Sequence, residues 1–553
     1  MKSGKLILIL VVIGLFAIAC GPAAQPTPTP APAVQPTATA APAAQPTPTP
    51  ALAGPKKGGT LKVWQQEPGE MDAAKTCSVA TMGIAWQIWD NLFSVDSKNN
   101  VHPQMAGDWS LSPDGRLLEV SLRDGLRWHD GKAVTSDDVV ASLNRWMGLD
   151  GIGKLVAERK DTVEAVDSDT VRIKLKESLG PMLYGLGKPG CAIAQIAPKW
   201  VVDKYPATAR IELDGVVGSG AYKFKEWVPT SHLALERFEG YKPRSESPDG
   251  WSGAHIAYAD KIEFRFIPQV ATGIAALKAG QIDFGTISAL DEVTQIQKDP
   301  DRFKVYISRP GGLSDIMVNM HPTALLGKNP RGDKLRKAIW IAQDPKEMMA
   351  SLGPSQFYSV HGKIFFENTI WSSDAAKDLW EYHNLEAGKK LVAEAGYSGE
   401  RIRCSYTVGS GSQMGWCLTM TDLLKNRMGM NAVAEPAEQA QHLPIRLAPD
   451  RAELLATGFN YLTSGYPLNN LGIAQKFYHW ENEQMVKLFS EFASAVSYEA
   501  QKAIADKMQL LALQELPMYY WGETASVRVS REWVNGYLNT PVIPVFWNIW
   551  LSR

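Results

Sequence analysis

The chain has 553 residues with 57 basic and 58 acidic side chains, a net charge of −1 that leaves no basic surplus for binding nucleic acid. Three of the basic residues, Lys2, Lys5 and Lys56, precede Lys57, so the remainder carries 54 basic and 58 acidic side chains. The stretch 58–553 has no second long apolar run and is long enough for two or more lobes with separate hydrophobic cores.

The N-terminus has the pattern of a secretory signal peptide over residues 1–19. Lys2 and Lys5 precede an apolar run from Leu6 to Ala19, which is too short for a spanning helix. The sequence Ala17-Ile18-Ala19-Cys20 resembles a bacterial lipobox, with Ala at a first position where Leu is more usual. That resemblance implies cleavage before Cys20, lipidation of its thiol and attachment to the cell membrane.

Residues 20–57 are predicted to form a tether between the lipidated cysteine and the folded part. Gly21 to Pro55 is almost entirely Pro, Ala, Thr and Gln, and the sequence from Ala24 to Ala31 recurs from Ala44 to Ala51. Such a segment has no core to bury and is extended and semi-rigid. At ~3.1 Å per residue it could hold the folded part up to roughly 110 Å from the bilayer.

Four cysteines remain after Cys20, an even number in a compartment that permits disulfides. Cys404 and Cys417 are close enough in sequence to close a short loop, which would leave Cys77 to pair with Cys191. The alternative is four unpaired buried thiols, and sequence alone does not fix the connectivity.

The first elements of the folded part are predicted from turns and periodicity. Leu61 to Trp64 is a strand that begins directly after the tether, and a helix follows over about 80–93. A Pro113-Asp114-Gly115 turn between Trp109 and the alternating 118–122 indicates a hairpin. An Asp130-Gly131 turn then precedes a Thr135-x-x-Asp138 capping box, with a helical stripe of Val139, Leu143 and Trp146. His129, next to this turn, is interpreted as a flanking residue and not as part of an acid/base pair.

Strands and helices continue to alternate along the rest of the chain. Lys261 to Phe266 alternates polar and apolar residues as a half-buried strand does, and a helix is predicted to end at Gly280. Further helices are expected over 385–395 and along the stripe Ile504, Met508 and Leu511. The pattern predicts a mixed α/β protein.

In this order the segments resemble the extracytoplasmic solute-binding proteins of the dipeptide, oligopeptide and nickel ABC importer class (bacterial solute-binding protein family 5). The strongest match is Asp108 to Arg145, with its Asp-Gly turns and capping box. Further matches are Gly218 to Phe224, Leu277 to Asp283, Leu335 to Ile339, and Pro517. The resemblance covers essentially residues 58–553.

The resemblance implies an α/β, bilobed periplasmic-binding-protein-like fold of type II. Lobe I would comprise residues 58–305, with an extra subdomain at about 101–190. Lobe II would comprise 306–522, and 523–553 would return to lobe I. A small solute would be enclosed between the lobes as they close.

The implied function is capture of a small solute or short peptide and its delivery to the permease of an ABC importer, by a monomer with no cofactor, metal or catalytic residues. One alternative is a surface sensor or adhesin with the same fold. Another is a secreted hydrolase, but no convergent nucleophile and base are found in the sequence. The histidines at 102, 129, 232 and 255 do not have metal-ligand spacing, which makes a metal-chelate ligand a weaker alternative.

The place of the pocket in the family suggests candidate ligand-binding residues, for each of which core packing is the alternative. The candidates are Thr76, Met82, Trp86, Arg145, Trp371, Trp416, Tyr461 and Asn469. For Arg145, a bidentate contact to a ligand carboxylate and a solvent-facing helix position are both considered.

One segment departs from the family pattern. Peptide-binding members carry an acidic residue that pairs with the peptide's α-amino group, but the matching stretch Gly458 to Pro467 has no Asp or Glu. A buried ammonium without a counter-charge is costly. This favours a neutral, sugar-like or otherwise polar solute over an ordinary peptide and leaves the ligand's identity open.

Overall fold

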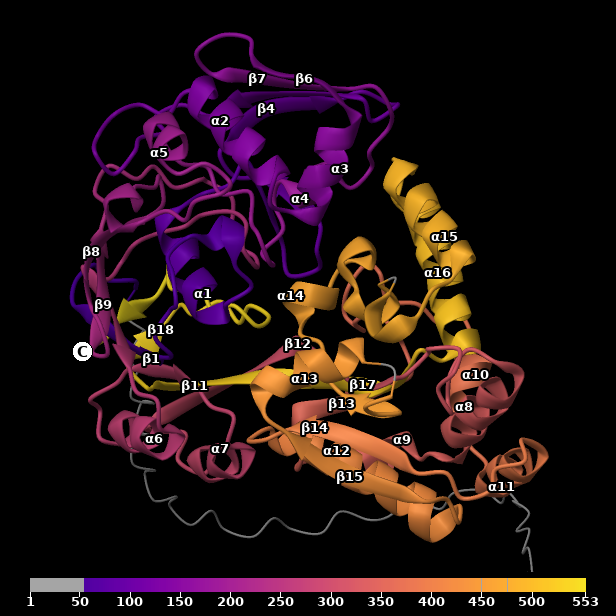
Figure 1. Cartoon of the computed structure of the whole chain (residues 1–553). Coiled ribbons are helices and arrows are strands. Elements are labelled where there is room, and N and C mark those ends of the chain that lie inside the picture. Colours follow the sequence, from indigo (N-terminus) through magenta and orange to yellow (C-terminus); the bar gives the residue numbers. More distant parts are fainter. Residues whose placement is uncertain (1–53, 449, 475) are drawn as a thin grey trace, which may run out of the picture. The chain divides into compact units, whose positions relative to one another are not determined.

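The computed structural model describes residues 54–448, 450–474 and 476–553, and Gly54–Arg553 form one compact unit (Figure 1). The predicted signal peptide, Cys20 and the tether up to residue 53 lie outside the described residues. Among the helices of the described part, none is long and apolar enough to cross a membrane.

The strands belong to one large sheet, one four-stranded sheet and two small pairs. The large sheet contains β1 (Thr60–Gln65), β8 (Tyr222–Val228), β9 (His232–Arg237), β10 (Lys261–Phe266), β11 (Phe284–Thr286), β12 (Phe303–Val318), β13 (Tyr358–Val360), β14 (Ile402–Thr407), β15 (Ala432–Ala437), β16 (Leu454–Ala456) and β17 (Met518–Arg531). The four-stranded sheet contains β4 (Ala106–Leu111), β5 (Leu117–Leu122), β6 (Lys160–Ala165) and β7 (Thr170–Leu175). The pairs are β2 (Phe93–Val95) with β3 (Val101–Pro103), and β18 (Val534–Asn535) with β19 (Trp550–Leu551).

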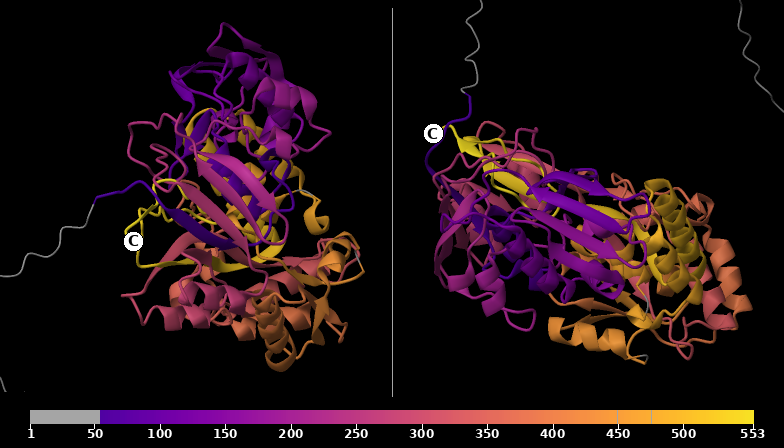
Figure 2. Two further views of the ribbon diagram at one scale, coloured as in Figure 1. Left: turned by 90° about the vertical axis from the view of Figure 1, so that its left-hand side faces the viewer. Right: turned by 90° about the horizontal axis from the view of Figure 1, so that it is seen from above.

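Helices cover these sheets and fill the connections. Those before β12 are α1 (Val79–Ile88), α2 (Ser136–Met147), α3 (Gly151–Arg159), α4 (Met182–Gly185), α5 (Lys199–Lys204), α6 (Val270–Lys278) and α7 (Leu290–Ile296). Those after it are α8 (Pro330–Ala342), α9 (Pro345–Ala350), α10 (Lys377–Glu381), α11 (Leu385–Glu394), α12 (Gly411–Asp422), α13 (Gln439–Leu447), α14 (Tyr461–Ser464), α15 (Glu483–Ser494) and α16 (Tyr498–Glu515). The last two pack side by side (Figures 1 and 2).

Two long strands join the lobes. The order of the large sheet is β15-β14-β16-β12-β17-β11-β1-β10-β9-β8, with β13 also paired to β17. β12 pairs with β16 at one end, and β17 pairs with β11 at the other. The two strands pair with each other from Phe303 opposite Arg531 to Met317 opposite Met518. The expected lobe boundaries at 305/306 and 522/523 therefore fall inside these strands, because a continuous pair of strands makes the crossing.

We call the stretch of chain between β12 and β17 the second lobe, and the rest of the compact unit the first lobe. In the first lobe, the elements predicted from turns and periodicity are present. β4 and β5 form the predicted hairpin, and the capping box of Thr135 and Asp138 starts α2. The predicted strand at 61–64 lies within β1, and the one at 261–266 is β10. The four-stranded sheet with α2 and α3 forms the subdomain at the top of Figure 1.

The helix expected over 80–93 is shorter than predicted. It ends at Ile88 because Trp89 has extended backbone angles (φ −116°, ψ 137°). Phe93 to Val95 then forms β2, which pairs with β3. The apolar run there is buried on all sides, so its periodicity could not show where the helix stops.

The Gly218-x-Gly220 motif packs directly against the end of α1. The Gly220 N–H donates to the Ile88 carbonyl at 2.8 Å, and the His129 ring bonds the same turn through the Gly218 N–H at 3.2 Å and the Gly220 carbonyl at 3.1 Å. Burial lowers the pKa of His129 to about 4, so its ring is neutral at physiological pH. His129 is therefore a structural residue of this turn.

Replacing Gly218 with alanine is expected to lower the free energy of unfolding by about 2–3 kcal/mol. A Cβ at this position would lie 1.9 Å from the Ile88 carbonyl oxygen, so the backbone must shift. Gly151→Ala is the matched control, because nothing lies within 4 Å of its Cβ position. Urea denaturation of both variants measures the difference, and equal stabilities would contradict the close packing.

Candidate functional site

A cavity of about 480 Å³ lies between the two lobes and is the candidate site. Its volume is within the range of pockets that bind small molecules. The first lobe contributes Ala74, Lys75, Thr76, Cys77, Leu149, Asp150, Gly151, Lys188, Cys191 and Ala192, and the second contributes Leu462, Thr463, Leu468, Asn469, Leu471 and Ala474. We call it the interlobe cavity.

The loop between β1 and α1 brings Thr76 and Cys77 to the cavity. The Ser78 N–H donates to Thr76 Oγ1 at 3.0 Å, and Ser78 Oγ in turn caps α1 at the Thr81 N–H. The Thr76 carbonyl accepts from the Ala192 N–H at 3.1 Å. Beside this contact, Cys77 and Cys191 form a disulfide, so the two chain segments that form this wall of the cavity are covalently linked.

The charged side chains that line the interlobe cavity are all engaged by the protein itself. Lys188 Nζ lies 3.0 Å from Asp150 Oδ2, and both side chains are almost fully buried. Lys75 Nζ donates to the carbonyls of Ala207 at 2.9 Å and Ala209 at 3.2 Å. The wall therefore offers a ligand hydroxyl, amide and apolar groups, the neutralised pair of Lys188 and Asp150, and the positive charge of Lys75, whose partners are carbonyl oxygens.

Arg145 faces neither the cavity nor solvent. Its guanidinium forms a fork with the Asp72 carboxylate and also donates to the carbonyls of Tyr205 and Ala209. Both side chains of this ion pair are at most 4% exposed. All of these hydrogen bonds of the Arg145 guanidinium are made within the first lobe. Arg145 therefore has a structural role, and neither the expected contact to a ligand carboxylate nor the alternative of an exposed helix position describes it.

The second lobe presents its cavity residues on a short, capped segment. Asn460 caps α14 by accepting from the Thr463 N–H, and the Asn470 side chain donates to the Ile364 carbonyl at 2.8 Å. Behind this segment, the Asp315 carboxylate accepts from Thr457 Oγ1 at 2.5 Å and from the N–H groups of Gly458 and Phe459 at 3.3 Å. Asp315 thus holds the start of the segment that reaches the cavity.

The stability of the protein is expected to fall as the pH rises from about 4 to 7 because of Asp315. Burial raises the pKa of this carboxyl to about 7, although its hydrogen bonds act in the opposite direction. Between pH 3.8 and 7 the folded state therefore keeps a proton that the unfolded state has released. The loss amounts to a few kcal/mol and is complete above pH 7, since each pKa unit corresponds to about 1.4 kcal/mol.

Asp315→Asn removes this titration. The unfolding free energy of the variant relative to the wild type is expected to increase from pH 4.5 to pH 8 in urea titrations. Parallel pH profiles for the two proteins would show that the carboxyl is already ionised in the folded state at pH 4.5.

Two of the sequence-predicted ligand residues, Thr76 and Asn469, line the interlobe cavity. Five others are buried side chains at most 4% exposed and do not line it: Met82, Trp86, Trp371, Trp416 and Tyr461. Trp86 packs edge-on against Trp547, and Trp371 against Tyr466. The tryptophans among the candidates are therefore core residues, which was the alternative considered for each of them.

Tyr461 contributes to contact between the lobes. Its hydroxyl donates to Asn99, and its ring stacks on Trp251 with centroids 6.4 Å apart. Tyr466 similarly stacks on Tyr184 at 3.9 Å. The lobes therefore touch through aromatic pairs next to the cavity.

Sequence reasoning missed Asp150 and Lys188, which line the cavity. Nothing in their local sequence marks them, because the ion pair joins residues that are far apart in the sequence. The number and spacing of the cysteines, in contrast, indicated their pairing. Cys77 pairs with Cys191 and Cys404 with Cys417, which is the arrangement considered from their spacing.

A second group was also missed, formed by the buried His361 and Glu523 and the half-buried Glu367, with potential ligand atoms within 4.8 Å of one another. The Lys363 N–H donates to His361 Nδ1 at 3.2 Å, so the proton of the neutral ring is on Nε2. That nitrogen faces Glu523 Oε2 at 3.8 Å. This separation is too long for a hydrogen bond, and Nε2 has no hydrogen-bond partner among the described residues.

The two lobes, the crossing strands and the cavity between the lobes define the chain as a solute-binding protein. The model of the bacterial extracellular solute-binding proteins, family 5, matches residues 100–462, and the chain belongs to this family.

Known proteins with similarity to the chain extend over most of its length. "Probable peptide ABC transporter periplasmic-binding protein y4tO" of Sinorhizobium fredii is 26% identical over 89% of this chain and 93% of its own length. The substrate-binding protein CtaP of Listeria monocytogenes has a TM-score of 0.77 at 21% identity, over 90% of this chain and all of its own. The oligopeptide-binding protein AppA of Bacillus subtilis, solved with a nonapeptide, has a TM-score of 0.70 at 20% identity, over 90% and 100%.

Proposed function

We propose that this protein captures a polar solute without a free ammonium group in the interlobe cavity and delivers it to an ABC importer. The family and the name of the S. fredii relative support the role in import. In this proposal Cys20 carries the lipid, and the Pro-rich segment tethers the lobes to the outer side of the cell membrane. No catalytic step is involved.

The observation that carries the choice of ligand is the pairing of charges around the cavity. Asp150 is already matched by Lys188, and the segment 458–467, which supplies Thr463, has no acidic residue. An ammonium group in the cavity would lose its hydration without gaining a counter-charge, which is costly. Hydroxyl and amide groups of a solute can instead bond to Thr76, Thr463 and Asn469.

An ordinary peptide is the second candidate, and the names of two similar proteins favour it. The S. fredii protein is named for peptide transport, and the B. subtilis structure holds a nonapeptide. A peptide with a free N-terminus would have to break the pair of Asp150 and Lys188 to gain a carboxylate. Such a rearrangement would lower its affinity relative to a blocked peptide.

Isothermal titration of the full-length protein with matched ligands separates the two candidates. Each tripeptide is titrated with a free and with an acetylated N-terminus, beside a trisaccharide of similar size. We expect the acetylated peptide or the sugar to bind at least tenfold more tightly than the free peptide. Tighter binding of the free peptide would contradict the proposed ligand class and leave the importer role intact.

A pair of asparagine variants tests the location of the site. Asn469→Ala removes a side chain that lines the cavity, and it is expected to weaken the best ligand about tenfold, the effect of one lost hydrogen bond and its desolvation. Asn426→Ala is the control, because that side chain bonds Asp422 on an exposed helical turn. Equal affinities of the two variants would place the ligand elsewhere.

A further inference from the structure

Lys75 is the charged residue of the interlobe cavity that has no carboxylate partner among the described residues. It belongs to the segment Ala74 to Cys77, which lines the cavity from the first lobe. Two of the three N–H bonds of its ammonium group donate to the carbonyls of Ala207 and Ala209, at 2.9 and 3.2 Å. The third N–H has no acceptor in the described part of the chain. Carbonyl oxygens are neutral, so the positive charge of Lys75 is uncompensated at the wall.

The other two charges on the wall cancel each other. Lys188 Nζ lies 3.0 Å from Asp150 Oδ2 and also donates to the Cys191 carbonyl. The other oxygen of Asp150 accepts from the N–H groups of Ile152 and Gly153, at 2.9 and 3.1 Å. Both side chains of the pair are almost fully buried. Neither of them is therefore available to a charged group of a ligand.

Neither the loop that carries this lysine nor the second lobe supplies a counter-charge. In the loop, Asp72 is paired with Arg145 in a buried ion pair. Glu70 is paired with Arg210 at 3.0 Å. The stretch 458–474, which supplies the second lobe's part of the wall, contains no Asp, Glu, Lys or Arg. Two lysines and one aspartate thus line the cavity and give it a net charge of +1, which favours an anionic ligand over a neutral one of the same shape.

We propose that the solute of the interlobe cavity carries a carboxylate group and that Lys75 binds it. This inference rests on the proposed function, because it names the charged group of a solute that has no ammonium group. The carboxylate accepts from the third N–H of Lys75, and Thr76, Thr463 and Asn469 bond to hydroxyl or amide groups elsewhere on the solute. A short N-acylated peptide with a free C-terminus and a sugar acid both have this chemistry.

The wall suits a carboxylate better than a phosphate group. Phosphate sites combine several donors, such as arginine forks and uncapped helix N-termini, because phosphate carries up to two negative charges. The two helices that begin near the wall, α1 and α3, are already capped by Ser78 and Asp150. The guanidinium of Arg145 is occupied by Asp72. One uncompensated lysine therefore matches the single charge of a carboxylate.

Isothermal titrations of the full-length protein with matched acids and neutral analogues test the carboxylate. An N-acetylated tripeptide is compared as the free C-terminal acid and as the C-terminal amide, and the sugar acid lactobionate is compared with lactose. We expect the acid of at least one pair to bind at least about tenfold more tightly than its neutral counterpart, as a hydrogen bond to a charged group would give. The pair that responds shows whether the carboxylate belongs to a peptide or to a sugar.

The proposal is overturned if neither acid binds more tightly than its neutral counterpart. That result would leave the proposed function intact, because the proposed function is decided by the separate comparison of free and acetylated N-termini.

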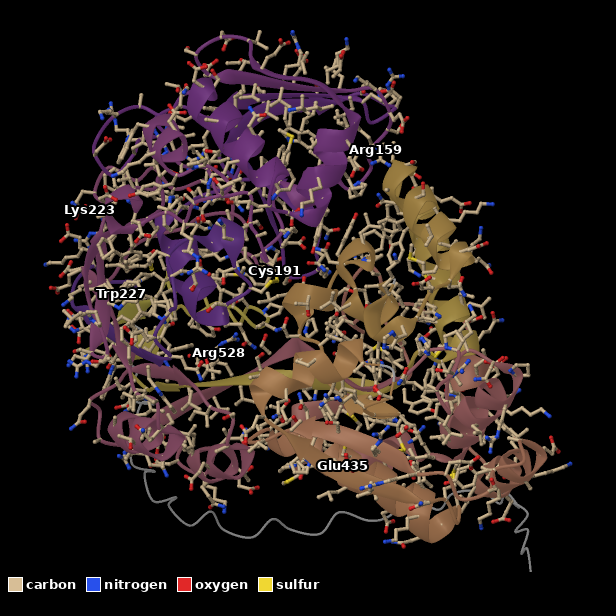
Figure 3. All side chains as sticks on the ribbon, in the orientation of Figure 1. Arg159, Cys191, Lys223, Trp227, Glu435 and Arg528 are labelled. Atoms are coloured by element: carbon tan, nitrogen blue, oxygen red, sulfur yellow. A yellow bond between two sulfur atoms is a disulfide. The ribbon has the colours of Figure 1, made fainter. Side chains whose placement is uncertain are left out.

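Variants of Lys75 then assign the preference to this residue. Lys75→Gln removes the charge but keeps N–H groups for the carbonyls of Ala207 and Ala209, so it should weaken the acid about tenfold and leave the neutral analogue unchanged. Lys75→Arg keeps the charge and should retain the preference for the acid. Lys223→Gln is the control, because this lysine pairs with Glu236 and does not line the cavity, and Figure 3 shows it at the outer edge of the first lobe.

The ratio of the two affinities separates a charge contact from a structural role. If Lys75→Gln weakens the acid and the neutral analogue equally, Lys75 only holds the loop and the proposal is overturned. If Lys75→Gln does not fold, the salt dependence of the wild type decides the question. Added sodium chloride should then weaken the acid and not its neutral analogue, and equal responses of the two would overturn the proposal.

Discussion

Replacing Asp72 with alanine is expected to lower the free energy of unfolding by about 3–5 kcal/mol, because it leaves the buried Arg145 without a counter-charge. The Asp72 carboxylate is 0% exposed and accepts from Arg145 Nη1 at 3.2 Å and from the Ile211 N–H at 3.1 Å. The pair ties α2 to the loop that carries Thr76 and Cys77. We therefore expect the affinity for the interlobe ligand to fall together with stability, as measured by urea denaturation and titration.

Two controls separate the loss of the charge pair from the loss of a carboxylate in general. Asp203→Ala removes the partner of Lys199 from an exposed i,i+4 pair and should leave stability almost unchanged, because solvent screens this pair. The double variant Asp72→Leu, Arg145→Met removes both buried charges and should be more stable than Asp72→Ala alone. If the double variant is the less stable of the two, the uncompensated charge is not the cause.

Removing the disulfide of Cys77 and Cys191 by a double alanine variant is expected to destabilise the protein by about 5 kcal/mol and to weaken ligand binding. The two cysteines are 114 residues apart, so the bond excludes many conformations of the unfolded chain. Both also line the interlobe cavity, and Figure 3 shows Cys191 near the contact between the lobes. Without the bond, the loop at Thr76 is held by hydrogen bonds alone.

The disulfide of Cys404 and Cys417 is the internal control. Its cysteines are 13 residues apart, so the same model gives about 3 kcal/mol for its removal. It joins β14 to α12 and does not line the cavity, so its loss should leave the affinity of the folded protein unchanged. Equal ligand affinities for the two double variants would show that the bond at Cys77 does not shape the site.

Part of the candidate site could be predicted from the sequence. A residue was placed correctly where its role depends on neighbours close to it in the sequence or on the position of the pocket in the family. Thr76 and Asn469 came from the family's pocket location and do line the interlobe cavity. The tryptophans came from the same argument and are buried in the core, because sequence does not tell which face of an element a large apolar side chain covers. Arg145 has its partner 73 residues away, a distance that no local spacing encodes.

The sequence by itself determined the turns, the hairpin, the capping box of α2 and the family, because each depends on residues a few positions apart. Only the tertiary structure decided that β12 and β17 pair as one continuous crossing, that Lys188 neutralises Asp150 at the cavity wall, and that Arg145 is paired with Asp72 in the core. These features arise where segments distant in sequence are packed together. Their energies depend on burial and on which charged groups become neighbours, and both are fixed only when the chain folds.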